Sequence, residues 1–341
     1  MKITVENVLN LKNKKNKISL RPDSYNYLFY GLPGSGKTSI AAEMFPNHVM
    51  IQGEIGSKGL IGVNGVPVAD YKDLYDICNV LSKNEVRDAY DTIIVDTATK
   101  VGKIIENFIT NKHGKEVMKD VYTRGGAYPL IDKYWDECFN RVKAKGYNFV
   151  WLCHTNTIDV KDPKNDDKVL YQKFSPKLSN RISNLIEPEV DYTFYFTHSG
   201  EDLKVVTCRT KKNEGKNRTN IVRKMPTVLD LSENPKVSAR TILDELTLSI
   251  RAYGDENITE EKVTTNLEES IRESIDIEIL KEEVKRLAGE LKENGKGEEA
   301  KNLMERAFGV DEDGKQRKLS ELTQMAETTI LKLIDDLKEI L

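Results

Sequence analysis

The amino-acid sequence predicts an α/β domain with a mainly parallel sheet over the first 250 residues, followed by an all-helical module. Three observations support this fold class. Continuous apolar runs such as residues 92–95 (TIIV) and 148–153 (NFVWLC) alternate with stretches of helical spacing, as in sheets that are buried on both faces. The first strand runs into a glycine-rich loop, and a helix follows that loop. After about Leu248 the strand signals stop, and apolar residues recur every three or four positions.

The elements of the α/β domain follow one another in a regular order. Residues 25–30 predict the strand that enters the glycine-rich loop, residues 39–45 the helix after it, and residues 48–52 a second strand. Apolar residues at helical spacing predict helices over residues 71–82 and 130–145. Two more predicted strands, separated by the turn Ser-Gly-Glu-Asp, form a hairpin over residues 192–197 and 203–209.

The sequence after residue 250 has a different character. Residues 251–265 are polar and predict a linker, and three helical patterns follow at residues 266–293, 298–308 and 320–341. We therefore expect four parts: an N-terminal extension (1–20), an α/β core (21–250), the linker (251–265) and a helical module (266–341).

The charge is uneven along the chain. The formal net charge of the 341 residues is −3, but residues 260–341 alone carry −8, which leaves +5 for residues 1–259. The positive net charge of residues 1–259 suits contact with phosphates better than the negative net charge of residues 260–341. No run of about 20 apolar residues is present to span a membrane, and no secretory signal opens the chain. We expect a cytoplasmic protein without a membrane partner, with free thiols at Cys78, Cys138, Cys153 and Cys208.

Residues 31–38 read GLPGSGKT, which matches the phosphate-binding P-loop in full and in the right setting, between a strand and a helix. Glycines allow the loop to aim successive backbone N–H groups inward, and the helix N-terminus adds its positive dipole end. Lys37 is expected to contact the β- and γ-phosphates, and the Thr38 hydroxyl to ligate Mg²⁺. The nucleotide, ATP, is expected to contact Gly31, Pro33, Gly34, Ser35, Gly36, Lys37, Thr38 and Ser39.

Two polar positions follow other predicted strands. Asp96 ends the TIIVD strand and is the expected second carboxylate of the magnesium site; the alternative is a helix-capping aspartate. His154 follows the NFVWLC strand, whose end should open on the same crevice because ligands of open α/β sheets bind there. It is a candidate sensor of the γ-phosphate, and the alternative is a histidine with only a structural role.

The order of these motifs resembles that of RecA-superfamily core ATPases. Residues 31–38, 92–97, 148–156 and 204–213 occur in the family's order, and residues 20–250 resemble its compact phage-encoded members, the single-strand annealing ATPases of phage recombination. The resemblance implies a RecA-like fold, ATP bound with Mg²⁺ between subunits of a homo-oligomer, and single-stranded DNA as a partner. The C-terminal helices resemble a module appended to such phage proteins, which implies contact with a single-strand-binding protein or another recombination protein.

The resemblance also assigns roles to single residues. RecA-like ATPases carry the catalytic base on the strand after the P-loop helix, and Glu54 stands just past that strand here; the alternative is an ordinary loop residue. In RecA-type assemblies a basic residue after a late strand reaches the neighbouring subunit's ATP. Residues 204–224 hold eight basic residues and one acidic residue, so the candidates are Arg209, Lys211 and Lys212. A solvated hairpin is the alternative.

Two predicted loops have a composition suited to single-stranded DNA. Residues 109–128 include an Arg-Gly-Gly hinge, and residues 157–184 combine basic with aromatic side chains, so that phosphates meet charges and bases stack on rings. The candidate contacts are Arg124, Lys168, Tyr171, Lys173, Phe174, Lys177 and Arg181. A mobile lid or a solvated loop is the alternative for both. Two other functions stay open at this stage: a P-loop phosphotransferase with such a lid, and a nucleotide-gated scaffold with slow hydrolysis.

Overall fold

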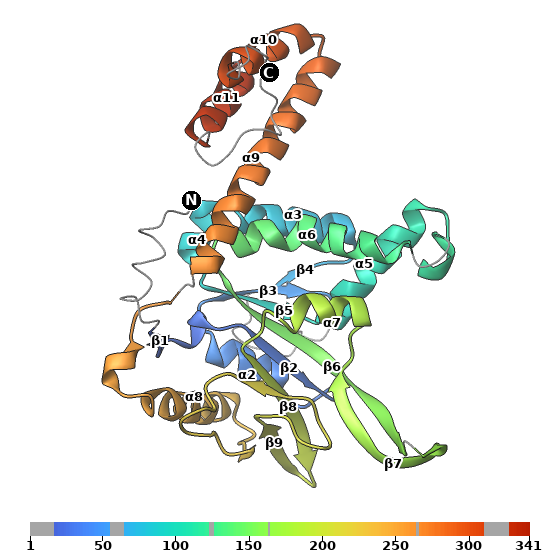
Figure 1. Ribbon diagram of the computed structural model, residues 1–341, viewed down its shortest axis with the longest axis vertical. Coiled ribbons are helices and arrows are strands. Elements are labelled where there is room, and N and C mark those ends of the chain that lie inside the picture. The colour runs from blue at the N-terminus through green and yellow to red at the C-terminus, as the bar shows by residue number, and fades with distance from the viewer. Residues whose placement is uncertain (1–16, 55–64, 123–125, 163, 264–265, 310–326) are drawn as a thin grey trace. The chain divides into compact units, whose positions relative to one another are not determined.

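The computed structural model describes residues 17–54, 65–122, 126–162, 164–263, 266–309 and 327–341 (Figure 1). Contacts within the chain divide it after Val263 into an α/β unit and a C-terminal unit. Each unit is described by itself below.

The α/β unit is built on a ten-stranded sheet. Its strands lie in the order β11-β9-β8-β2-β6-β5-β3-β4, with β10 on β8 and β7 on β6. The bounds are β2 (Tyr27–Gly31), β3 (His48–Gln52), β4 (Gly65–Pro67), β5 (Thr92–Asp96), β6 (Asn148–Asp162), β7 (Asn165–Pro176), β8 (Tyr192–Ser199), β9 (Asp202–Val206), β10 (Lys216–Asn217) and β11 (Val228–Asp230). All pairs from β4 to β8 along this order are parallel, and β9 and β11 are antiparallel additions.

The register of the parallel strands places the ends of four of them together. Gly31 of β2 lies opposite His154 of β6, Leu152 of β6 lies opposite Asp96 of β5, and Asp96 lies opposite Gln52 of β3. Because parallel strands end at one edge of a sheet, the P-loop and the polar residues after β3, β5 and β6 share that edge.

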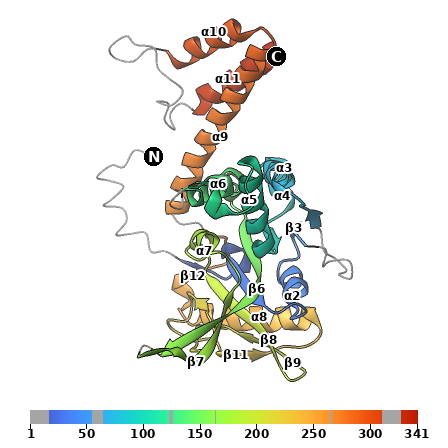
Figure 2. The same ribbon diagram turned by 90° about the vertical axis from the view of Figure 1, so that its right-hand side faces the viewer.

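Helices cover both faces of this sheet. Their bounds are α2 (Lys37–Met44), α3 (Tyr71–Leu81), α4 (Asn84–Ala89), α5 (Ala98–Lys112), α6 (Tyr128–Ala144), α7 (Asn180–Ile186) and α8 (Pro235–Arg251). Figures 1 and 2 show α3, α5, α6 and α7 on one face and α2 and α8 on the other. Side chains alternate along each strand, so Leu28 and Tyr30 join one core and Tyr27 and Phe29 join the other.

This architecture confirms the predicted α/β fold with a mainly parallel sheet. The strand that carries the P-loop is β2, in the middle of the sheet. The strand predicted to end in Cys153 is the first part of β6, which lies beside β2, and the strand that ends in Asp96 is β5, on the far side of β6. The predicted hairpin is also present, as β8 and β9. Central placement follows from composition, because only uniformly apolar strands tolerate burial on both faces.

The largest difference from the sequence prediction concerns residues 157–184. The sequence predicts a loop there, but β6 continues to Asp162 and pairs with β7, so most of this segment is a long β-hairpin that α7 follows. Figures 1 and 2 show the hairpin projecting from the sheet. Its strands carry β-branched and aromatic residues such as Ile158, Val160 and Tyr171, which favour extended pairing.

The other predicted loop and the predicted linker also differ from the structure. Within residues 109–128, α5 occupies the first positions to Lys112 and a 3₁₀ turn spans Met118–Asp120. Within residues 251–265, the strand β12 (Ile258–Thr259) pairs in parallel with β1 (Ile18–Ser19), which lies in the predicted N-terminal extension. Both pieces therefore attach to the α/β unit, and the division into four parts stays a proposal.

The C-terminal unit consists, in its described part, of α9 (Asn266–Glu293), α10 (Gly297–Phe308) and α11 (Glu327–Ile340). An apolar core joins the three helices through Leu287, Leu291, Ala300, Phe308 and Leu333. Residues 320–326 of the last predicted helix lie outside the described residues. Across the described parts of both units, no helix combines the length and the apolar character that crossing a membrane requires.

The aromatic packing between α6 and β6 provides a test of the core. Trp135 and Trp151 are buried and stack with ring centroids 5.3 Å apart. We expect Trp135→Ala to lower the free energy of unfolding by about 3–5 kcal/mol, because it leaves a large cavity. Urea denaturation monitored by circular dichroism measures this loss. The exposed Leu248→Ala serves as the control and should change it by no more than about 0.5 kcal/mol; equal effects of the two changes would contradict the packing.

Candidate nucleotide site

The P-loop takes its shape from glycines at positions that favour glycine through their backbone conformation or through a close neighbour. Gly34 and Gly36 have φ angles of 79° and 77°, in the left-handed region that favours glycine. A Cβ on Gly31 would lie 2.2 Å from the carbonyl oxygen of Phe196 on β8. Strand pairing and glycine conformation together fix the backbone of the P-loop (residues 31–38) as a cradle at the N-terminus of α2.

The Lys37 side chain is buried inside this loop. Its Nζ donates hydrogen bonds to the carbonyl oxygens of Gly31 (3.1 Å) and Leu32 (2.8 Å) and to Ser35 Oγ (3.1 Å). Burial lowers the pKa of Lys37 to about 8, although the nearby Asp96 carboxylate opposes the shift. An anion in the cradle would restore the charged form, so the loop is suited to a phosphate group.

A hydroxyl and a carboxylate meet beside the loop. Thr38 Oγ1 donates a hydrogen bond of 2.9 Å to Asp96 Oδ2. Burial raises the pKa of Asp96, the hydrogen bond from Thr38 opposes this shift, and the Glu54 carboxylate adds to it.

The oxygens of Thr38 and Asp96 fit Mg²⁺, which prefers oxygen ligands. Among the described residues, no group of three or more His, Cys, Asp and Glu side chains is placed to hold a metal ion. The ion would therefore complete its shell with phosphate oxygens and water, as Mg²⁺ does in nucleotide sites. When bound, it would neutralise charge on the phosphates.

A second polar cluster lies at the same edge of the sheet. Glu54 Oε1 accepts a hydrogen bond from Thr97 Oγ1 (3.0 Å), and His154 Nε2 lies 3.0 Å and 3.2 Å from the two Glu54 carboxylate oxygens. Because a carboxylate only accepts, Nε2 carries the proton, and Nδ1 is left as a buried atom without a partner in the described structure. Glu54, Asp96 and His154 thus lie close together, as we expect for residues at the ends of the parallel-paired parts of the neighbouring strands β3, β5 and β6.

Sequence reasoning missed Thr97. It is buried, caps α5 by accepting from the Lys100 N–H, and fixes one Glu54 oxygen. The signal that could have found it is its place directly after Asp96, where a threonine before a helix commonly acts as a cap.

The candidate finger residues lie after β9. Arg209, Lys211 and Lys212 are exposed, and Arg209 Nε lies 3.3 Å from Glu214 Oε2. In the described part of the chain, none of the three makes a hydrogen bond or ion pair with the P-loop. A role toward a neighbouring subunit's ATP stays a prediction.

The candidate DNA contacts fall into two groups. Lys168, Tyr171 and Lys177 are exposed on the hairpin or at its end, and Lys168 Nζ lies 3.9 Å from Asp162 Oδ2 on the same hairpin. The remaining described candidates are less exposed or have close partners: Lys173 pairs with Glu214, Arg181 pairs with Asp132, and the Phe174 ring stacks on Tyr195 at 5.3 Å. Arg124 lies outside the described residues.

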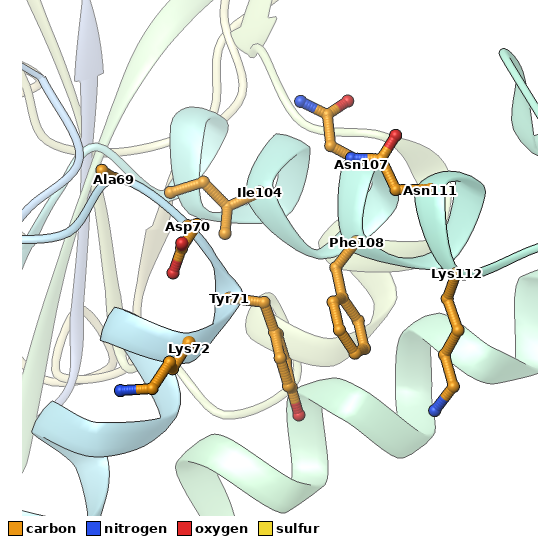
Figure 3. Close-up of a pocket in the computed structure, with 9 residues that line it drawn as sticks. All are labelled: Ala69, Asp70, Tyr71, Lys72, Ile104, Asn107, Phe108, Asn111 and Lys112. Atoms are coloured by element: carbon orange, nitrogen blue, oxygen red, sulfur yellow. The ribbon is translucent and has the colours of Figure 1, made fainter. Parts of the chain in front are cut away.

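An open cavity of about 720 Å³ lies elsewhere, between the start of α3 and the end of α5. Figure 3 shows its rings, Tyr71 and Phe108, which stack at 4.1 Å. No residue of the P-loop or of the Glu54 cluster lines it, so it is separate from the nucleotide site.

Comparison with known proteins agrees with this geometry. Residues 23–219, more than half of the chain, match the family model described as the AAA domain. The chain belongs to the AAA domain family. This AAA protein is therefore a nucleotide-binding ATPase of the P-loop class, and the predicted ATPase identity is confirmed at that level.

Individual relatives of the AAA protein are distant. The SPbeta prophage-derived uncharacterized protein YorG of Bacillus subtilis (strain 168) is 23% identical over 324 residues, which cover 92% of each chain. Among solved structures, the RadB recombinase matches with 9% identity and a TM-score of 0.36, over 67% of this chain and 94% of its own. The flagellar accessory protein FlaH from Methanocaldococcus jannaschii matches with 12% identity and a TM-score of 0.31, over 69% and 95%. The fold assignment comes from the strand order and the P-loop.

The buried Lys37 predicts how nucleotide affinity depends on pH. Phosphates favour the charged form of the Lys37 amine. The affinity for Mg–ATP should therefore be highest below the Lys37 pKa of about 8 and should weaken as the pH rises above that value. Between pH 7 and pH 9 we expect the Kd for Mg–ATP to rise about tenfold. Calorimetry at both pH values, in buffers of different ionisation enthalpy, measures affinity and proton uptake together. An unchanged Kd with no proton uptake at pH 9 would contradict the environment of Lys37.

Proposed function

We propose that this AAA protein hydrolyses Mg–ATP and acts on single-stranded DNA in phage-type recombination or annealing. It works as a homo-oligomer with ATP between subunits, in the cytoplasm of a bacterial host. The observation that carries the proposal is the meeting of two clusters at one edge of the sheet. Thr38 with Asp96 would bind the metal, and Glu54 with His154 lies next to them.

Glu54 is the proposed general base. Its carboxylate is held by two donors, Thr97 and His154, and it lies close enough to Asp96 to raise the pKa of that group. A carboxylate fixed in this way can orient a water molecule toward the γ-phosphate and accept its proton. Lys37 and the P-loop amides would bind the phosphates, and His154 would fix the orientation of Glu54.

The hairpin of β6 and β7 supports DNA as the partner. It leaves the sheet directly after His154 and presents Lys168 and Tyr171 to solvent, with Lys177 at its end. Cationic and aromatic side chains on one projecting element suit a single strand, which offers phosphates and exposed bases. The prophage origin of the Bacillus subtilis relative agrees with a phage function.

Two further parts belong to the proposal. The exposed Arg209, Lys211 and Lys212 would act on ATP bound by a neighbouring subunit. The C-terminal helices, whose part of the sequence carries the acidic excess, would contact a single-strand-binding protein or another recombination protein.

The catalytic assignment is tested by Glu54→Gln. This change keeps the size of the side chain but removes the base, so we expect ATP turnover to fall by about 100-fold or more while Mg–ATP binding persists. The exposed Glu43→Gln on α2 is the matched control and should keep the parent rate. Turnover by phosphate release and binding by calorimetry are measured on the same samples; a parent-like rate for Glu54→Gln refutes the assignment.

The DNA assignment is tested by changing Lys168 and Lys177 together to alanine. Each phosphate contact contributes about −0.7 to the slope of log K against log salt for a single strand, so the slope of the double variant should be less steep by about 1.4. Fluorescence anisotropy with a labelled oligothymidylate over a salt series measures the slope. Lys83→Ala with Lys236→Ala changes two exposed lysines elsewhere and should keep the parent slope. Two parallel lines for parent and hairpin variant would exclude these contacts.

A further inference from the structure

The first turn of α5 contacts the start of the hairpin as well as Glu54. Thr99 Oγ1 donates a hydrogen bond of 2.9 Å to the carbonyl oxygen of Lys177 and accepts one of 3.4 Å from the His154 N–H. The Lys177 N–H donates to the His154 carbonyl at 2.8 Å. One threonine hydroxyl therefore bridges the two chain segments at the point where the hairpin leaves the sheet, called here the hairpin neck (His154 and Lys177).

The same two elements also hold the proposed base. Thr97, two residues before Thr99, donates to Glu54 from the cap of α5, and the His154 side chain contacts Glu54 from β6. The two groups that fix the Glu54 carboxylate thus come from the neck itself and from the cap of the helix that the neck contacts. Thr99 is the side chain that ties the neck to α5, the helix whose cap residue Thr97 contacts Glu54.

We infer that Thr99 is a positioning residue that couples the hairpin neck to Glu54, so that DNA on the hairpin and nucleotide at the P-loop change each other's affinity. The inference rests on the proposed function, because it takes the hairpin as the DNA site. Coupling between two binding sites is reciprocal: nucleotide changes the affinity for DNA by the same factor by which DNA changes the affinity for nucleotide.

Thr99 is suited to separate coupling from binding. Within the described part of the chain, its hydroxyl makes no hydrogen bond to the P-loop, to Glu54 or to the ammonium groups of the hairpin lysines, and the backbone bond between Lys177 and His154 persists without it. Replacing Thr99 by valine keeps the shape of the side chain and removes the bridge, together with the contact of the hydroxyl with the buried Cys153 thiol. Nucleotide binding alone and DNA binding alone should therefore stay within about twofold of the parent.

The experiment measures the Kd of the full chain for labelled oligothymidylate with and without Mg²⁺ and a non-hydrolysable ATP analogue. The ratio of the two values is the coupling. We expect a ratio that differs from one by about fivefold or more in the parent, and within about twofold of one in Thr99→Val, since one hydrogen bond corresponds to about fivefold. Thr99→Ser, which keeps the hydroxyl, should restore the parent ratio.

A matched control distinguishes coupling from a general effect on α5. Thr110→Val removes a hydroxyl from the same helix, where it donates to the Asn107 carbonyl, and should keep the parent ratio. A Thr99→Val protein that is less stable but couples like the parent would have a structural role only, and the inference would be overturned.

The outcomes for the parent separate this inference from the proposed function. If the parent binds the analogue and DNA but with a ratio of one, the coupling is refuted while both binding assignments stand. If it binds no analogue, or binds no DNA either with or without the analogue, the proposed function itself fails, and the coupling fails with it.

Discussion

The parallel pairing of β2, β6, β5 and β3 is the constraint on which the functional edge of this protein depends. The register sets Gly31 opposite His154 and Asp96 opposite Gln52, so residues far apart in sequence meet at one edge of the sheet. A slip of one residue would turn every side chain of a strand to the other face. Since each strand is buried on both faces by different helices, such a slip would place core residues wrongly on both sides.

Two ionisable groups at this edge of the sheet are buried, and burial disfavours their charged forms. Burial lowers the pKa of Lys37 and raises that of Asp96, so both groups are pushed toward their neutral forms. Groups with pKa values shifted by burial and by specific neighbours are typical of functional sites. A bound triphosphate would place negative charge beside Lys37, and its cation would place positive charge beside Asp96. Ligand binding would then offset the free-energy cost of burying these two charged groups.

Much of the site could be predicted because its signals are local. The P-loop is a continuous motif, Asp96 ends an apolar run, and Glu54 and His154 each follow a strand that composition identifies. The hairpin was missed because a strand that is exposed on both faces has no simple apolar pattern, and its pairing partner lies beyond a polar turn. Thr97 and Thr99 were missed because their contacts join positions 43 and 78 residues away, and the sequence does not display such contacts.

The pairing of β1 with β12 has a consequence for where the α/β unit ends. Strand signals and the last long helix stop near residue 250, so a boundary drawn from the sequence falls there. A fragment that ends at that point lacks Ile258 and Thr259, the partners of Ile18 and Ser19, together with the Glu261 carbonyl that accepts from Ser19 Oγ. The β1 and β12 strands near the two ends of the unit thus pair with each other. The shortest fragment that keeps all of these contacts extends about a dozen residues past the end of α8.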